Sequence, residues 1–255
     1  MNMLETILSR KSVRHYKQEK IDWGIIADIL KFANDLPMLI DGIAVEYKLV
    51  SNIETKQGFY GPLSLNAPYY ICISSEEKEN YLVNAGYLMQ QISLYINSKG
   101  LGTCFIDTAT PGKSLKSTMK YKYVTAIAFG KTSKPLFRNM IEAKRLPESD
   151  VVVYKEEVSP DIQKMLTAAR YAPSHMNSQP WRFVAYKNRI HIFCKKNAFL
   201  KSVLKNSKMI DMGIMLANLL LTAEELWIDV SFTKSVALKQ KQFPNHEYFI
   251  TLNIG

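Results

Sequence analysis

The twelve residues from Ala172 to Phe183 are rich in polar side chains, in the order Ala-Pro-Ser-His-Met-Asn-Ser-Gln-Pro-Trp-Arg-Phe. Hydroxyl, imidazole and amide groups can donate and accept hydrogen bonds, and recognition of the edge of a flat heterocycle requires such groups. The alternative is an ordinary loop whose polar side chains bond to their own backbone. The local chemistry leaves both interpretations open.

A second candidate site is the basic stretch Arg10-Lys11-Ser12-Val13-Arg14-His15-Tyr16. Three cations and one hydroxyl fall within five residues, and guanidinium groups match phosphate oxygens in a bidentate way. This stretch therefore suits a phosphate group. The alternative is a basic N-terminal arm that touches nucleic acid, which is the commoner role of such a cluster.

Rigid elements are predicted on both sides of the polar loop. Ser159-Pro160 indicates the start of a helix, because serine caps free backbone N–H groups and proline fits the first helical position. Apolar residues then recur at helical spacing, and the helix ends before Pro173, since a residue that precedes proline is driven out of the helical region. The aromatic and β-branched residues of Trp181–Tyr186 predict a strand.

The first half of the chain contains further predicted elements. Its helices are Met3–Ser9, Asp22–Asn34 and Asn80–Ser98, and its strands are Val45–Val50, Tyr69–Ile73 and Tyr123–Gly130. Gly86 within a helix indicates a close approach of backbone or ligand. The stretch Gly100–Phe105 follows a helix and lacks a third glycine, so it is no dinucleotide fingerprint, and no P-loop motif occurs.

The second half repeats the first in outline. Helix-then-proline recurs at Pro37 and Pro173, a helix with an early glycine recurs at Gly86 and Gly213, and a closing strand recurs as Tyr123–Gly130 and Tyr248–Gly255. We interpret this as an internal duplication, with domains at 1–150 and 151–255 and the polar segment Lys131–Asp150 as the linker.

The two predicted halves differ in their polar residues. The basic cluster has no counterpart before Ser159, and the residues after Pro37 lack the polar side chains that follow Pro173. Each half therefore retains one part of a composite site. This interpretation predicts that Arg14 lies close to Asn177 in space.

Composition limits the classes of protein that the chain can represent. Its 255 residues, 47% hydrophobic and 22% charged, indicate an ordinary soluble globular protein. Three scattered cysteines and four scattered histidines give neither a disulfide framework nor a metal site. With no signal peptide or membrane-spanning stretch in the sequence, we expect a cytoplasmic location. The net charge of +10 favours anionic partners, a phosphorylated ligand or nucleic acid. For most of the lysines, which are spread along the chain, the interpretation is a solvated basic surface that keeps the protein in solution.

These motifs resemble those of the FMN-dependent nitroreductases. That family typically shows an R-x-S-x-R-type stretch near the N-terminus, here Arg10-Lys11-Ser12-Val13-Arg14, and a P-S-x-x-N-x-Q-P-W loop, here Pro173 to Trp181. The long distance between the two resembles the fused branch of the family, in which two half-size repeats form a pseudo-dimer. The resemblance implies an α/β (α+β) fold with a central, mostly antiparallel sheet flanked by helices.

The resemblance also implies the residues that bind FMN. Arg10, Lys11, Ser12 and Arg14 would hold the phosphate, the ribityl chain and one edge of the ring, and Pro173, Ser174, His175 and Asn177 would line the flavin from the other half. Gly100-Leu101-Gly102 would meet the ring through its backbone, and Arg145 or Lys144 would meet the phosphate. Gln179 and Trp181 would support the loop. The role of His175 stays open, because the family usually has a small or hydroxyl residue there.

The resemblance implies an oxidoreductase that carries tightly bound FMN. NAD(P)H, a transient co-substrate, would give a hydride to flavin N5, and a small organic acceptor such as a nitroaromatic or a quinone would then take its place in a ping-pong cycle. Because the flavin carries the chemistry, we expect no catalytic acid, base or nucleophile from the protein. One chain would suffice as a monomer, with no membrane or nucleic-acid partner. The alternatives are a different flavin reaction, a flavin protein without turnover, and a basic nucleic-acid-binding protein.

Overall fold

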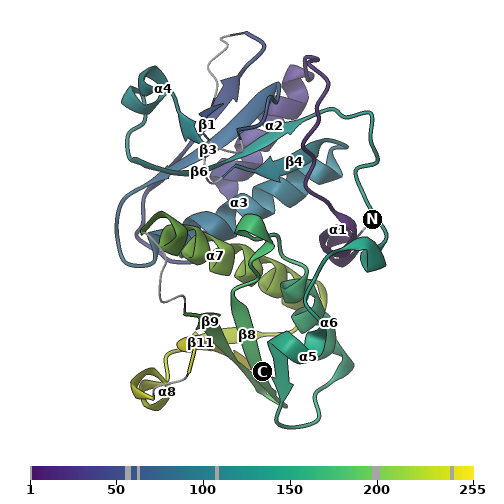
Figure 1. The fold of residues 1–255 in the computed structure, drawn as a ribbon, viewed down its shortest axis with the longest axis vertical. Helices are drawn as coiled ribbons and strands as arrows, with labels where there is room; N and C mark the ends of the chain where they lie inside the picture. The colour runs from purple at the N-terminus through teal and green to yellow at the C-terminus, as the bar shows by residue number, and fades with distance from the viewer. Residues whose placement is uncertain (1, 55–58, 62–63, 107–108, 197–201, 242–243) are drawn as a thin grey trace.

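The computed structural model describes residues 2–54, 59–61, 64–106, 109–196, 202–241 and 244–255 (Figure 1). The elements of its first half are α1 (Met3–Ser9), α2 (Trp23–Asp35), β1 (Val45–Ser51), β2 (Phe59–Tyr60), β3 (Tyr69–Ser75), α3 (Tyr81–Ser98), β4 (Gly102–Phe105), β5 (Thr110–Pro111), α4 (Lys113–Ser117) and β6 (Lys122–Gly130). Then follow η1 (Met140–Glu142), α5 (Glu148–Val151), β7 (Val152–Tyr154), α6 (Pro160–Arg170), η2 (His175–Asn177), β8 (Trp181–Tyr186), β9 (Arg189–Lys195), α7 (Ser202–Glu225), β10 (Val230–Thr233), α8 (Val236–Gln240) and β11 (His246–Ile254). The helices and strands predicted from the sequence are confirmed to within two residues.

The described strands form two main sheets and one short two-stranded pair. The first sheet has the order β1-β3-β6-β4, and the second has the order β10-β11-β9-β8-β7. All neighbours in both main sheets are antiparallel except β7 and β8. In the first sheet β3 is buried along its whole length, including its last two residues, Ser74 and Ser75.

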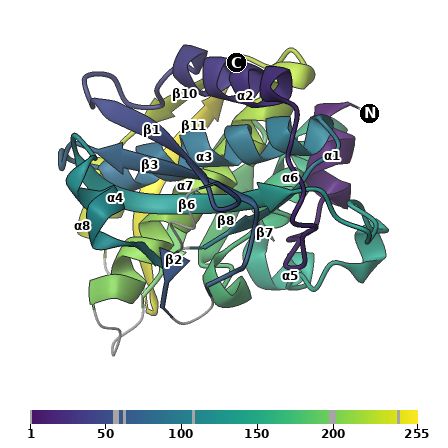
Figure 2. The ribbon, with the colours of Figure 1, turned by 90° about the horizontal axis from the view of Figure 1, so that it is seen from above.

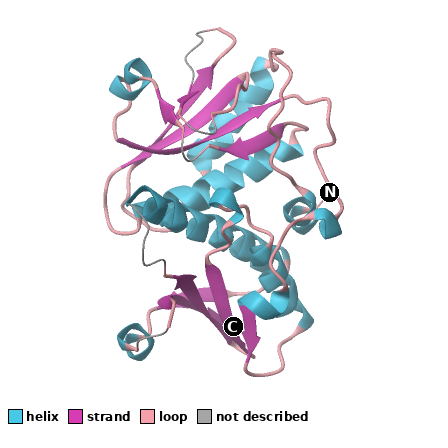
Figure 3. Cartoon of the chain, in the orientation of Figure 1, coloured by secondary structure: helices cyan, strands magenta, loops and turns pink. Residues whose placement is uncertain are grey.

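Two long helices, α3 and α7, lie between the sheets (Figure 3). The prediction of mostly antiparallel strands with flanking helices is confirmed, but that of one central sheet was wrong. Each half has a sheet of its own, and the centre of the molecule is helical. The reason is visible in α3, which is apolar around much of its circumference and is buried from Val83 to Asn97 at most positions.

Glycine allows α3 and α7 to approach each other closely. An added Cβ at Gly86 would lie 2.1 Å from the carbonyl oxygen of Ile210, and one at Gly213 would lie 2.0 Å from the carbonyl oxygen of Val83. Any side chain at either glycine would collide with the backbone of the other helix. The close approach that the sequence predicts at Gly86 is therefore confirmed, and it is an approach of backbone.

The main strands and helices of the two halves follow a similar order. Read in order, the strands β1, β3, β6 and β4 match β8, β9, β11 and β10, and the helices α2 and α3 match α6 and α7. The glycine contacts are reciprocal, because Gly86 meets the residue three positions before Gly213, and Gly213 meets the residue three positions before Gly86.

The segment 131–150, predicted as a linker, packs against the N-terminal part of the chain. It contains η1 and the start of α5, and Phe137 pairs with Arg10 in an isolated β-bridge. The backbone N–H of Arg138 donates to the carbonyl of Ser9 at 2.8 Å. The segment is therefore held against the end of α1, next to the basic stretch.

Helix α1 contacts both halves. Its Ile7 packs in a small core with Leu94 of α3 and Ala168 and Tyr171 at the end of α6. From the end of α1 the chain, dark purple in Figures 1 and 2, runs along the edge of the first sheet toward α2. None of the described helices is long and apolar enough to cross a bilayer.

Candidate functional site

The basic stretch is held along the edge strand of the first sheet. The backbone N–H of Val13 donates to the carbonyl of Thr103 at 2.9 Å, and Ser12 forms a parallel β-bridge with Thr103. Gly102 makes this contact possible, because an added Cβ would lie 2.7 Å from a methyl carbon of Val13. Glycine at position 102 thus allows the basic stretch to lie directly against the edge strand β4.

Arg10 is the most deeply buried cation of the stretch, with 3% of its surface exposed. Its Nε and Nη2 atoms have no hydrogen-bond partner among the described residues. Burial lowers the pKa of the Arg10 guanidinium to about 10, and the positive charges of Arg138 and Arg14 act in the same direction. A buried guanidinium with idle donors is costly unless an anion binds to it.

A cavity of about 470 Å³ gathers further cations around Arg10. Its walls carry six cationic side chains and one carboxylate, from Arg10, Lys11, Arg14, Arg138, Lys144, Arg145 and Glu142. We call it the cationic cavity. Burial, with the charges of Arg138 and Arg10, lowers the pKa of Arg145 to about 10. Like charges at this density favour a multiply charged anion such as a phosphate.

The polar loop forms the opposite wall of the cationic cavity. Met176, Asn177 and Gln179 adopt left-handed backbone conformations, with φ values of 49°, 56° and 45°. For non-glycine residues this conformation costs roughly 1–3 kcal/mol each, and such strain persists only where surrounding contacts enforce it. The loop is therefore built into one conformation by its neighbours.

Hydrogen bonds hold the polar loop in this conformation. The guanidinium of Arg145 donates to the side-chain oxygen of Asn177 at 3.1 Å, and the Asn177 amide donates to the carbonyl of Lys144 at 2.9 Å. The side-chain oxygen of Gln179 accepts the backbone N–H of Leu146 at 2.9 Å. Gln179 and Trp181 are both buried. The contact of Gln179 ties the polar loop to the segment 131–150.

A buried carboxylate on α7 completes the attachment of the loop. Both oxygens of Asp211 accept the backbone N–H of His175, at 2.9 and 3.1 Å, and one oxygen accepts the Ser178 hydroxyl at 3.4 Å. Asp211 was not among the predicted site residues. An acid within the apolar run Met209-Ile-Asp-Met-Gly-Ile-Met215 is the sequence signal that could have identified it.

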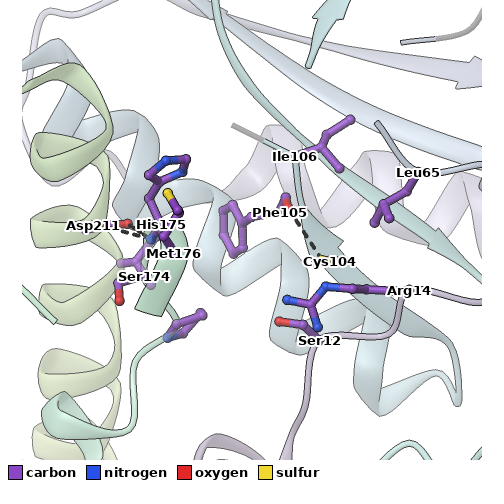
Figure 4. Close-up of a pocket in the computed structure, with 12 residues that line it drawn as sticks. Ser12, Arg14, Leu65, Cys104, Phe105, Ile106, Ser174, His175, Met176 and Asp211 are labelled. Carbon is purple, nitrogen blue, oxygen red and sulfur yellow. Dashed lines mark hydrogen bonds between the residues drawn. The ribbon is translucent and has the colours of Figure 1, made fainter. Parts of the chain in front are cut away.

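A second, mostly apolar cavity of about 190 Å³ adjoins the cationic one (Figure 4). We call it the apolar cavity. Its apolar walls are formed by Leu65, Phe105, Ile106 and Ile214. In Figure 4, Ser174, His175 and Asp211 lie on one side of it and Ser12 and Arg14 lie on the other.

The two cavities share five lining residues, Ser12, Arg14, Pro173, Ser174 and Met176. They therefore form one continuous space with a cationic end and an apolar end. A planar aromatic ring suits the apolar end, and a phosphate suits the cationic end. The residues present thus fit a molecule such as FMN.

Most of the predicted site residues line this space. The cationic cavity includes Arg10, Lys11, Ser12, Arg14, Arg145, Pro173, Ser174 and Asn177, and the apolar cavity includes His175. Arg14 and Asn177, which we predicted to lie close together, both line the cationic cavity. Lys144 and Arg145 both line it, and Arg138 joins them as a residue that was not predicted.

Gly100 and Leu101 were predicted at the ring, and neither lines the two cavities. Gly100 ends α3 in a left-handed conformation with φ of +77°. The Leu101 N–H donates to the carbonyl of Ile96 and its carbonyl accepts from the Asn97 amide, so its backbone groups are occupied. The residues at the cavity lie slightly further along the chain, at 104–106.

Within the described part of the chain, no three His, Cys, Asp or Glu side chains gather where they could hold a metal ion. All three cysteines are buried, and none of them forms a disulfide.

A model of the family described as "Putative TM nitroreductase" matches residues 2–223. The crystal structure of a "putative nitroreductase" from Thermotoga maritima MSB8 has a TM-score of 0.66 and 23% identity, over 99% of this chain and 94% of that chain. No curated protein matches.

Two further solved structures cover a smaller part of the chain. A nitroreductase family protein from Clostridium difficile 630 has a TM-score of 0.49 and 18% identity, over 61% of this chain and 99% of that chain. An FMN-dependent nitroreductase from Clostridium difficile R20291 has a TM-score of 0.42 and 24% identity, over 58% of this chain and 94% of that chain. The likeness to the Thermotoga structure shows a shared fold over nearly the whole chain.

Proposed function

Because the chain belongs to the nitroreductase family whose model spans residues 2–223, we propose that it is an FMN-dependent oxidoreductase. It passes electrons from NAD(P)H to a small organic acceptor such as a nitroaromatic or a quinone. The observation that carries this proposal is Arg10, buried to 3% exposure with two idle guanidinium nitrogens, on a cationic cavity that continues into an apolar one.

The cationic cavity holds the phosphate of FMN. Arg10 and Arg145 donate charge-assisted hydrogen bonds to it, and Arg138 and Lys144 add positive charge. Binding of the phosphate offsets the cost of burying Arg10, since an opposite charge favours the charged guanidinium. The burial of Arg10 also distinguishes this site from an exposed basic arm that binds nucleic acid.

The apolar cavity holds the flavin ring. Phe105, Ile106 and Ile214 exclude water from it, and Ser12 and Arg14 offer donors at the side where it meets the cationic cavity. When bound, FMN supplies the redox chemistry, by accepting a hydride from NAD(P)H and passing electrons to the acceptor. The nicotinamide and the acceptor would bind in turn beside the flavin, which gives ping-pong kinetics.

We further infer that 1–150 and 151–255 are repeats that together form a pseudo-dimer. The matching strand orders and the reciprocal contacts of Gly86 and Gly213 support this inference. The first half contributes Arg10 and Arg14 and the second contributes the loop after α6. One chain therefore completes the site and functions as a monomer, and its dependence on NAD(P)H fits a cytoplasmic location.

Comparison of FMN with riboflavin tests this proposal, because the two differ only in the phosphate. We expect the flavin-free protein to bind FMN at least about 100-fold more tightly than riboflavin, since two hydrogen bonds to charged groups contribute roughly 1.5–3 kcal/mol each. Arg10→Met should reduce this ratio toward 1. Equal affinity of the wild-type protein for the two flavins, or no binding of either, would contradict the proposed site.

A further inference from the structure

A third cavity, of about 240 Å³, adjoins the two that form the proposed flavin site. We call it the Lys134 pocket. It shares Ser12 and Arg14 with both of the other cavities, so it lies beside the space assigned to the flavin. The residues that line it are Lys11, Ser12, Val13, Arg14, His15 and Lys134.

Backbone hydrogen bonds hold two segments of the chain together around the Lys134 pocket. The backbone N–H of Lys17 donates to the carbonyl of Lys131 at 2.9 Å. In the other direction along the chain, the backbone N–H of Arg138 donates to the carbonyl of Ser9 at 2.8 Å. Lys134 lies between these two attachments on one segment, and the basic stretch lies between them on the other. The fold therefore brings Lys134 to the basic stretch.

The Lys134 pocket is positively charged, and none of its described lining residues is a carboxylate. Lys11, Arg14 and Lys134 supply cations, and the imidazole of His15 can donate a hydrogen bond. None of the three cations forms an ion pair with another described residue. Their charge is thus available to an anionic ligand.

Bound FMN would account for only part of this charge. Lys11 and Arg14 also line the cationic cavity, which we assign to the FMN phosphate. In Figure 4 the side chain of Arg14 lies next to Ser12, at the edge of the apolar cavity. His15 and Lys134, in contrast, line neither of these two cavities. The Lys134 pocket therefore suits a second anionic group, on a ligand that binds beside the flavin.

The proposed function supplies one ligand of this kind, the nicotinamide dinucleotide. NADPH differs from NADH by a phosphate monoester on the 2′-oxygen of its adenosine ribose. Such a phosphate carries a charge of about −2 at pH 7, and either phosphate of the diphosphate bridge that both molecules contain carries less. Dinucleotide sites for NADH offer a carboxylate to the 2′-hydroxyl, whereas those for NADPH offer a cation to the 2′-phosphate. The residues of the Lys134 pocket match the second kind of site.

We propose that the Lys134 pocket binds the 2′-phosphate of NADPH, and that Lys134 is a specificity-determining residue for NADPH over NADH. The proposal rests on the proposed function for the identity of the ligand. Lys11 and Arg14, which line both the Lys134 pocket and the cationic cavity, lie between the phosphate of NADPH and that of FMN. Their positive charges reduce the repulsion between the two phosphates.

Equilibrium binding of NADP⁺ and NAD⁺ to the FMN-loaded protein tests the proposal, because the two differ only in the 2′-phosphate and neither reduces the flavin. Both dissociation constants are measured by calorimetry. The wild-type protein should bind NADP⁺ at least about tenfold more tightly than NAD⁺. Lys134→Met should lower this ratio by about fivefold, as expected for the loss of one exposed charge pair. The affinities for NAD⁺ and for FMN should not change.

Two control variants separate the position of the charge from its presence. Lys134→Arg retains the charge and should keep the wild-type ratio. Lys131→Met removes the same charge three residues away, from a side chain that pairs with Glu19 at 3.8 Å and does not line the Lys134 pocket. It should leave the ratio unchanged. Both lysines are exposed, so both methionine variants should fold.

Equal wild-type affinity for NADP⁺ and NAD⁺ would overturn the proposal. So would a preference for NADP⁺ that Lys134→Met leaves intact, or one that Lys131→Met reduces as much. A wild-type protein that takes up no FMN contradicts the proposed function instead. The two dinucleotides are then titrated into the flavin-free protein, where the loss of preference in Lys134→Met is still expected and its absence would overturn the proposal.

Discussion

The guanidinium of Arg145 lies 3.1 Å from the side-chain oxygen of Asn177, to which it donates a hydrogen bond. The two residues come from segments on either side of α6. Their contact, with that of the Asn177 amide to the carbonyl of Lys144, fixes the polar loop against the segment 131–150. The shape of the cationic cavity therefore depends on an interaction between two loops.

Replacement of Asn177 should separate the role of its side chain from that of its backbone. Asn177→Ala and Asn177→Gly both remove the bonds to Arg145 and Lys144, so both should weaken FMN binding, by about tenfold for a bond of ~1.4 kcal/mol. Only alanine must adopt the left-handed conformation at a cost of roughly 1–2 kcal/mol. Urea unfolding should show Asn177→Ala to be less stable than Asn177→Gly by about 1 kcal/mol, and equal stabilities would contradict this account of the loop.

Arg10 should destabilise the protein when no flavin is bound. Arg10→Met removes a buried charge with idle donors, so the free energy of unfolding of the flavin-free protein should rise by ~1–3 kcal/mol. The same change should abolish stabilisation by added FMN. Lys20→Met is the control, because it removes a positive charge from a side chain that is 71% exposed and should change stability by less than ~0.5 kcal/mol. A loss of stability in flavin-free Arg10→Met would refute the argument.

The affinity for FMN should depend on pH in a predictable direction. In the flavin-free protein the pKa values of Arg10 and Arg145 are lowered to about 10, and a bound phosphate raises them. The complex then holds more protons than the free protein above that pH, so affinity should fall as pH rises through about 10. It should also fall below about pH 6, where the phosphate takes up a proton.

Riboflavin is the control for this pH dependence, because it titrates at the ring but carries no phosphate. The ratio of FMN affinity to riboflavin affinity should be highest between about pH 7 and pH 9, on the pKa values above. A ratio that stays constant from pH 5 to pH 11 would show that the arginines do not hold the phosphate.

The contact between the two central helices should not tolerate a methyl group. Gly86→Ala and Gly213→Ala each place a Cβ about 2 Å from a backbone carbonyl oxygen. Each should lower the free energy of unfolding by about 3 kcal/mol or more, at the upper end for overpacking. Gly255→Ala, whose Cβ would come no closer than 3.5 Å to another residue, is the matched control. If Gly86→Ala and Gly213→Ala unfolded at the same temperature as Gly255→Ala, the close approach of the two helices would be contradicted.

Much of the fold could be predicted from the sequence because its signals are local. The helix that begins at Pro160 and the strands around Ile71 and Ile127 follow from capping, proline and apolar content, and they occur where predicted. The arrangement into two sheets around a helical centre could not be predicted in this way. This arrangement depends on contacts between distant residues, such as that of Gly86 with Ile210, and the periodicity of the sequence does not indicate which distant residues meet.

Arg10 and Asn177 could be selected from the sequence as candidate site residues, because their side-chain types alone indicate binding, and both line the cationic cavity. Asp211 and Arg138 were not predicted, because their positions at the site depend on tertiary contacts. Asp211 on α7 holds the polar loop, and Arg138 belongs to a segment that packs against the end of α1. Leu101 does not line either cavity, and its backbone N–H and carbonyl have partners within the protein that the sequence does not reveal.

The central claim, an FMN oxidoreductase, is tested most directly by the visible spectrum of the purified protein loaded with FMN, recorded before and after anaerobic addition of NADPH or NADH. The account predicts the absorption bands of a bound flavin, and their bleaching when the reduced nicotinamide is added. A colourless protein that takes up no FMN would contradict the site. A yellow protein whose bands neither nicotinamide bleaches would contradict the activity.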